Sequence, residues 1–177
     1  MKSLENQLSK LTASLADRQK GASIIKNHPN HFDQLFNLAL DSRAQRIHIV
    51  SSWILEQLLL ENIILLRSRF DYFLEQLPKI NHSSMQRPLS KILYYYVLDE
   101  TAFKKLNTIQ IDSILDISFD WVIAPAKTAT FSFAIKTISL LKNTRPWIKA
   151  TLKEAIENDE FVKKPGMIVS IKRVFKE

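Results

Sequence analysis

The sequence contains no cysteine, and only two of its 177 residues are glycine, Gly21 and Gly166. The lack of cysteine excludes disulfides, thiolate nucleophiles and cysteine-based zinc or iron–sulfur centres. Two isolated glycines exclude the GxGxxG and GxxxxGK[ST] loops that cradle phosphates. Low glycine with abundant Leu, Ile, Lys and Gln favours helices over sheets and tight hairpins. We therefore expect an all-α protein, and nothing in the sequence calls for a cofactor.

Long hydrophobic runs are also missing. The most apolar stretch, WILEQLLLENIILL, is broken by Glu56 and Glu61, and it falls short of the roughly 20 residues of a membrane span. The first residues, MKSLENQLSKLTASLADRQK, carry charges throughout and lack the apolar region of a signal peptide. From these absences we expect a cytoplasmic protein with no membrane partner.

Acidic side chains are absent between Asp120 and Glu154. Residues 1–126 carry a net charge of +1, whereas residues 127–177 carry +6. The basic residues of the acid-free stretch are Lys127, Lys136, Lys142, Arg145, Lys149 and Lys153. Clustered cations bind phosphate backbones without sequence preference. Nucleic-acid binding through the basic 127–153 region is therefore one of the two functions that the sequence favours.

Apolar residues recur every three or four positions along almost the whole chain, which indicates helices. Leu4, Leu8, Leu11 and Leu15 have this spacing and predict one N-terminal helix that caps the fold. Breaks in this pattern divide the rest into four helix pairs, and five of the six breaks contain a proline. The breaks fall at Asn27–Pro29, Pro78–Ser84, Asp99–Lys105, Ala124–Pro125, Asn143–Pro146 and Lys163–Gly166.

The helix pairs repeat. Similar segments begin at Asp33, Asp71, Asp112 and Ala150, at intervals of 38, 41 and 38 residues. An apolar residue follows each start by 21 positions, at Ile54, Ile92, Phe133 and Ile171. A period near 40 with two helices per unit resembles HEAT-type helical repeats. The resemblance covers Pro29 to Glu177 and implies a single repeat domain over residues 1–177, folded as a right-handed α-solenoid or HEAT-like superhelix.

A second resemblance concerns the segment from Ser42 to Leu93, SRAQRIHIVSSWILEQLLLENIILLRSRFDYFLEQLPKINHSSMQRPLSKIL. It is similar to small bacterial helical-repeat chains that carry the name adenylosuccinate lyase. True lyases of that kind rely on a mobile Ser/Gly-rich loop, and no segment of this sequence matches that loop. The resemblance therefore implies a helical-repeat fold, and lyase activity is only a remote alternative.

In a helical solenoid the second helix of each pair usually lines the concave, ligand-binding side. A helical wheel for residues 84–98 places Tyr96 with the apolar positions and Tyr94 on the opposite side. Tyr95 lies between them, where we expect a neighbouring repeat to cover it. The three consecutive tyrosines therefore cannot form one platform.

Aligning the second helices predicts one shared strip of side chains on the concave face, which we call the concave lane. Its residues are Trp53, Glu56, Arg87, Lys91, Tyr94, Ser132 and Lys136. One interpretation is a binding groove with aromatic, acidic and basic groups. The other, which the frequency of such strips favours, is an ordinary solvated helix surface. The aromatics Phe131, Phe133 and Trp147 fall at apolar positions and are predicted to be core.

Other clusters point less clearly to chemistry. Asp112, Asp116 and Asp120 lie four residues apart on one helix, where they predict a solvated surface or, alternatively, a Mg²⁺ or partner contact. His28 and His31 lie at a helix entry, and their spacing is not that of a zinc helix. We expect no metal site.

Some HEAT-like folds are DNA-alkylation-repeat glycosylases, which use concave tryptophans beside an aspartate. Trp53 with Glu56 is the nearest match here, with Glu in place of Asp, so that activity is a remote alternative. The function that we predict is a non-catalytic scaffold that binds a protein partner on its concave face.

Overall fold

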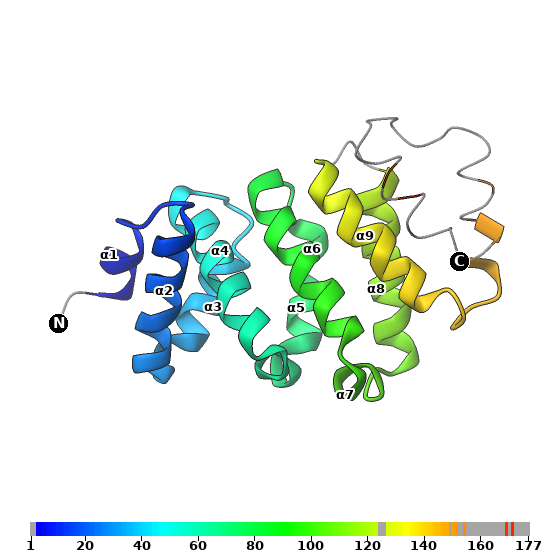
Figure 1. The fold of residues 1–177 in the computed structure, drawn as a ribbon, viewed down its shortest axis with the longest axis horizontal. Helices are drawn as coiled ribbons and strands as arrows, with labels where there is room; N and C mark the ends of the chain where they lie inside the picture. Colours follow the sequence, from blue (N-terminus) through cyan, green and yellow to red (C-terminus); the bar gives the residue numbers. More distant parts are fainter. Residues whose placement is uncertain are drawn as a thin grey trace. The chain divides into compact units, whose positions relative to one another are not determined.

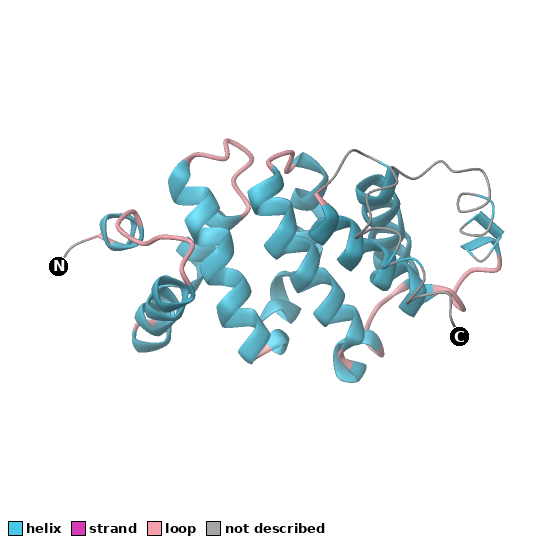
Figure 2. Cartoon of the chain, turned by 45° about the horizontal axis from the view of Figure 1, so that its top comes forward, coloured by secondary structure: helices cyan, strands magenta, loops and turns pink. Residues whose placement is uncertain are grey.

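The structure is a computed structural model, and it describes residues 3–123, 127–148, 150, 151, 154, 169 and 171. Across that part of the chain all regular structure is helical, which confirms the predicted all-α class (Figure 2). The chain divides into two compact units, Met1–Ile92 and Leu93–Glu177, and the boundary falls within helix α6 (Ser83–Leu98). The right-handed sense and the single domain stay predictions. The predicted fourth helix pair lies almost entirely outside the described residues.

The first unit begins with two helices, α1 (Leu4–Leu8) and α2 (Leu15–Asn27), so the prediction of one continuous N-terminal helix was wrong. The chain turns between them because polar side chains compete with the helix. Thr12 donates from its backbone N–H and its hydroxyl to the Asp17 carboxylate. The Ser14 hydroxyl then accepts the N–H of Asp17 and caps α2.

The first helix pair follows. A short 3₁₀ turn, η1 (Pro29–His31), leads into α3 (Phe32–Ala39), and α4 (Arg46–Glu61) is the second helix. Helices α1, α2 and α3 all pack against α4. The approach of α2 is unusually close, because a Cβ atom at Gly21 would lie 2.5 Å from Ile54 Cδ1. Glycine is therefore needed at position 21 for space.

The second pair starts with alternating short segments, η2 (Ile63–Arg69), α5 (Phe70–Gln76) and η3 (Leu77–Lys79). Its second helix, α6, has the predicted buried side, including Met85, Leu89 and Ile92. Within the described residues no single helix is long and apolar enough to cross a membrane. The segments Arg46–Glu61 and Ile63–Lys79 are long and apolar enough when taken together, but the chain bends by 113° between them.

The second unit contains the end of α6, the short α7 (Glu100–Phe103), and the pair α8 (Thr108–Ile123) and α9 (Thr128–Leu141). Helices α8 and α9 pack side by side (Figure 1). Helix α9 begins at Thr128, and the predicted start at Pro125 lies outside the described residues. Phe131, Ile135 and Ile138 of α9 are buried, which confirms the prediction of Phe131 as core.

Candidate functional site

The three consecutive tyrosines have three different surroundings. Tyr96 is buried, which confirms its predicted place in the core. Tyr94 is half-buried, and its ring centroid lies 5.8 Å from that of Phe133 on α9. Tyr95 is 39% exposed, so the prediction that a neighbouring repeat covers it was wrong. The reason is that Phe133 of α9 packs against Tyr94, and Tyr95 points about 100° away from Tyr94 around the axis of α6.

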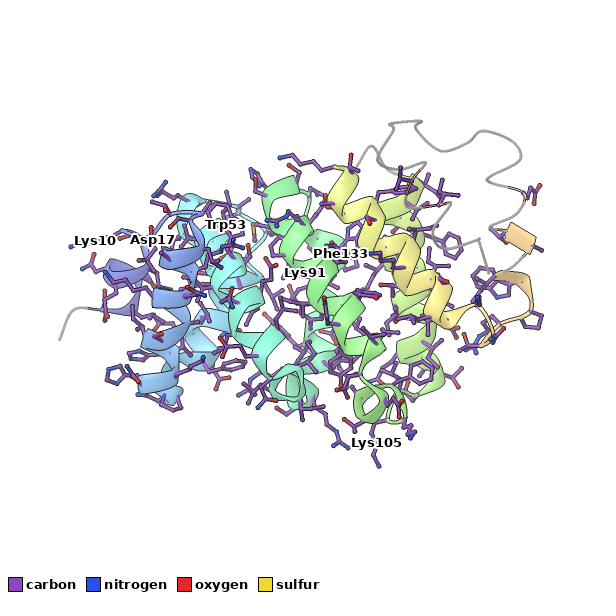
Figure 3. The ribbon with its side chains drawn as sticks, viewed as in Figure 1. Lys10, Asp17, Trp53, Lys91, Lys105 and Phe133 are labelled. Atoms are coloured by element: carbon purple, nitrogen blue, oxygen red, sulfur yellow. The ribbon has the colours of Figure 1, made fainter. Side chains whose placement is uncertain are left out.

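A lysine lies over two of these rings. Lys136 Nζ is 5.7 Å from the ring centroid of Tyr94 and 5.4 Å from that of Phe133, within the range of cation–π attraction. Tyr95 contacts Tyr94 edge to face, with centroids 5.2 Å apart and planes at 77°. Phe133, predicted to be core, is only half-buried (Figure 3).

Burial, followed by the proximity of Tyr95, raises the pKa of Tyr94 above its ordinary value of 10.0. The Tyr94 phenol is therefore neutral at physiological pH, where it can donate or accept a hydrogen bond. It is not a general base there.

The surface around these rings is apolar. Leu98 follows Tyr94 by one turn of α6 and is 44% exposed, and Leu140 follows Lys136 by one turn of α9 and is 39% exposed. We call this surface the aromatic–lysine face, and it consists of Tyr94, Tyr95, Leu98, Phe133, Lys136 and Leu140. Ser132 of the predicted lane is half-buried one turn before Lys136.

In the first unit, Trp53 has a structural task. Pro88 lies inside α6 and has no N–H to donate to the carbonyl of Ser84, four residues earlier. The indole Nε1 of Trp53 donates to that carbonyl at 3.0 Å. Trp53, which was predicted to face a ligand, therefore satisfies a backbone carbonyl of the neighbouring helix.

Glu56 is only 2% exposed, so it does not lie on an open surface as the concave lane required. Its Oε1 accepts a hydrogen bond of 2.8 Å from Lys91 Nζ, and its Oε2 lies 3.9 Å from Arg18 NH1. The acid thus joins α4 to α6 and α2. Of the four lane residues in this unit, only Arg87 is exposed, whereas Trp53 and Lys91, labelled in Figure 3, are half-buried.

The three described residues of the predicted basic patch, Lys127, Lys142 and Arg145, do not cluster. Lys127 and Lys142 cap opposite ends of α9, which separates their backbones by about 22 Å along the helix. Arg145 is committed to an ion pair with Asp112 at 2.8 Å. Lys149 and Lys153 lie outside the described residues.

The remaining clusters show no binding geometry. Asp116 and Asp120 are exposed on α8, while Asp112 pairs with Arg145. No group of three or more His, Asp or Glu side chains in the described part of the chain is placed to hold a metal ion. Trp147 is 45% exposed and contacts Phe119, so its prediction as core was wrong.

A family model described as a HEAT repeat domain matches residues 4–177. No curated protein and no solved structure matches the chain. The match spans both units, and it agrees with the helix pairs and the spacing near 40 residues.

Proposed function

Because the chain belongs to the HEAT repeat domain family, we propose that it is a non-catalytic scaffold that binds a protein partner. HEAT repeats generally mediate protein interactions, and stacked helix pairs provide extended surfaces for that purpose. The observation that carries the proposal is the aromatic–lysine face. It exposes two leucines and a tyrosine beside two further rings and a cation.

The composition of this face suits a protein better than a nucleic acid. Tyrosine and phenylalanine are enriched at protein interfaces, and exposed apolar side chains that cluster mark interaction sites. A phosphate backbone needs several cations along one path. The aromatic–lysine face contains one cation, while Lys127, Lys142 and Arg145 are separated or paired. Nucleic-acid binding is therefore the less supported function.

The buried position of Glu56 also bears on the glycosylase alternative. A carboxylate that acts on a nucleobase must reach its substrate. Glu56 is instead enclosed and bonded to Lys91, and the edge of Trp53 is bonded to Ser84. These contacts support a structural role for the pair.

Photocrosslinking tests the proposal. A photoreactive benzoyl-phenylalanine is placed at Tyr95, and in a separate variant at Lys105, an exposed residue in the turn after α7 (Figure 3). We expect protease-sensitive adducts in a cell extract at position 95, and none at position 105. Nuclease-sensitive adducts at position 95 would favour nucleic acid. Equal protein labelling at both positions would contradict a specific face.

A further inference from the structure

We propose that the aromatic–lysine face receives an acidic protein segment. In this arrangement a carboxylate of the partner meets Lys136 Nζ, and its apolar side chains meet Tyr95, Leu98 and Leu140. The inference rests on the proposed function and adds the chemical class of the partner.

Charge is the first argument. In the described part of the chain, Lys136 has no carboxylate within ion-pair distance, and its ammonium group lies over two rings instead. On the adjacent helix α8, Asp116 and Asp120 are exposed but form no ion pair with Lys136. The two acids at the start of α7 are occupied. Asp99 caps α7 through the N–H groups of Thr101 and Ala102, and Glu100 lies 3.7 Å from Lys104. Among the described residues, an incoming carboxylate would thus find at Lys136 a cation with no counter-ion within ion-pair distance.

The sequence around Lys136 also favours an acidic partner. Helix α9 and its two caps carry Lys127, Lys136 and Lys142, and no acidic residue occurs from position 121 to position 153. Helix α9 with its two caps therefore carries positive charge and no negative charge of its own, while the exposed acids Asp116 and Asp120 lie on the adjacent α8. Such a surface accelerates the approach of acidic partners and repels basic ones.

Preorganisation is the second argument. The rings of Tyr94 and Phe133 attract Lys136 through their faces, which reduces the freedom of a side chain that is usually mobile. Less entropy is then lost when a carboxylate binds.

The apolar neighbours decide between an acidic segment and a small anion. Tyr95 and Leu98 are three residues apart on α6, and Leu140 follows Lys136 on α9. All three are exposed, and a phosphate or a free carboxylate would leave them in water. Only a ligand that carries aliphatic or aromatic groups beside its acids would bury them.

A display selection tests the inference. The intact chain is presented to a random peptide library and, in parallel, to a random single-stranded oligonucleotide library. We expect peptides rich in Asp and Glu beside Leu, Ile or Phe to be enriched. Replacing Lys136 by Glu should raise the Kd of those peptides at least about tenfold. Lys136→Gln should raise it less, and Lys105→Glu, which reverses a cation away from the face, should not.

The outcomes of the selection distinguish the acidic preference from the proposed function. Enriched peptides that are neutral or basic, and whose binding is lost in Leu98→Ala, would overturn the acidic preference and leave the proposed function standing. Retention of oligonucleotides with no enriched peptide would overturn both and point to nucleic acid. Retention of neither library would also overturn both.

Discussion

The indole Nε1 of Trp53 donates a hydrogen bond of 3.0 Å to the carbonyl oxygen of Ser84. Within α6 this carbonyl would normally accept from the N–H of residue 88, but residue 88 is a proline and has no N–H. A proline inside a helix is costly mainly because it leaves this carbonyl without its partner. Here a side chain from α4 satisfies it. The contact fixes the second helix of one pair against that of the next.

This relationship predicts a coupling between Trp53 and Pro88. Trp53→Phe should lower the free energy of unfolding by about 1–2 kcal/mol, because the Ser84 carbonyl loses its donor. In Pro88→Ala, residue 88 regains an N–H that can bond to Ser84. Trp53→Phe should therefore cost less in the Pro88→Ala background, measured by urea denaturation. Strictly additive costs would show that the hydrogen bond does not act as described.

The ion pair of Glu56 and Lys91 leads to a second prediction. Lys91→Met leaves a buried carboxylate with only the distant guanidinium of Arg18, and it should cost about 3 kcal/mol of unfolding free energy. Glu56→Gln/Lys91→Met removes the charge as well, so the double variant should be more stable than Lys91→Met alone. Denaturant titrations of the single and double variants measure both values. A double variant that is less stable than Lys91→Met would contradict the account.

The close approach of α2 and α4 gives a third prediction. Gly21→Ala gains about 1 kcal/mol of helix propensity, but the new methyl group overlaps Ile54, at a cost of about 1–3 kcal/mol. We expect net destabilisation of about 1 kcal/mol in thermal or chemical unfolding. Ile54→Ala removes both atoms that the methyl group would overlap, Cδ1 and Cγ1, so Gly21→Ala should cost less in the Ile54→Ala background.

Ser23→Ala, at an exposed position of the same helix, is the matched control and should change stability by less than about 0.5 kcal/mol. A Gly21→Ala variant that is more stable than the parent would contradict the close packing of α2 against Ile54.

The loop before α4 predicts a dependence of stability on pH. Hydrogen bonds from the Arg43 side chain lower the pKa of Asp41 from 3.8 to about 2. A group whose pKa is lower in the folded state stabilises the fold above its unfolded value and loses this contribution as pH falls. Unfolding free energy should therefore fall between about pH 4 and pH 2. Asp41→Asn should flatten this decline, whereas Ser42→Ala in the same loop should retain it. An unchanged acid decline in Asp41→Asn would refute this assignment.

Helical periodicity and the repeat spacing were sufficient to predict the all-α class, the extent of α6 and the burial of Tyr96. These properties follow from local patterns of apolar residues. The concave lane was predicted less well, because a helical wheel shows only which residues share a side. It does not show that Glu56 is covered by Lys91 and Arg18, or that Trp53 is engaged by a backbone carbonyl.

The errors at Tyr95 and Trp147 have a similar cause. Both residues are large and mostly apolar, so composition favours burial, whereas exposure depends on which neighbour reaches each ring. The exposure of Leu98 and Leu140 could not be read from the sequence either, because single apolar residues on a protein surface are common and do not by themselves mark a binding site.

The central claim is that the aromatic–lysine face binds a protein. The most direct measurement is calorimetric titration of the partner identified by crosslinking at position 95, using the parent chain, Leu98→Ala and Ile109→Ala. Leu98 belongs to the face, while Ile109 is an exposed apolar residue of α8 outside it. The account predicts that Leu98→Ala weakens binding about tenfold or more and that Ile109→Ala leaves it unchanged. Equal affinities for the parent and Leu98→Ala, or a loss confined to Ile109→Ala, would contradict it.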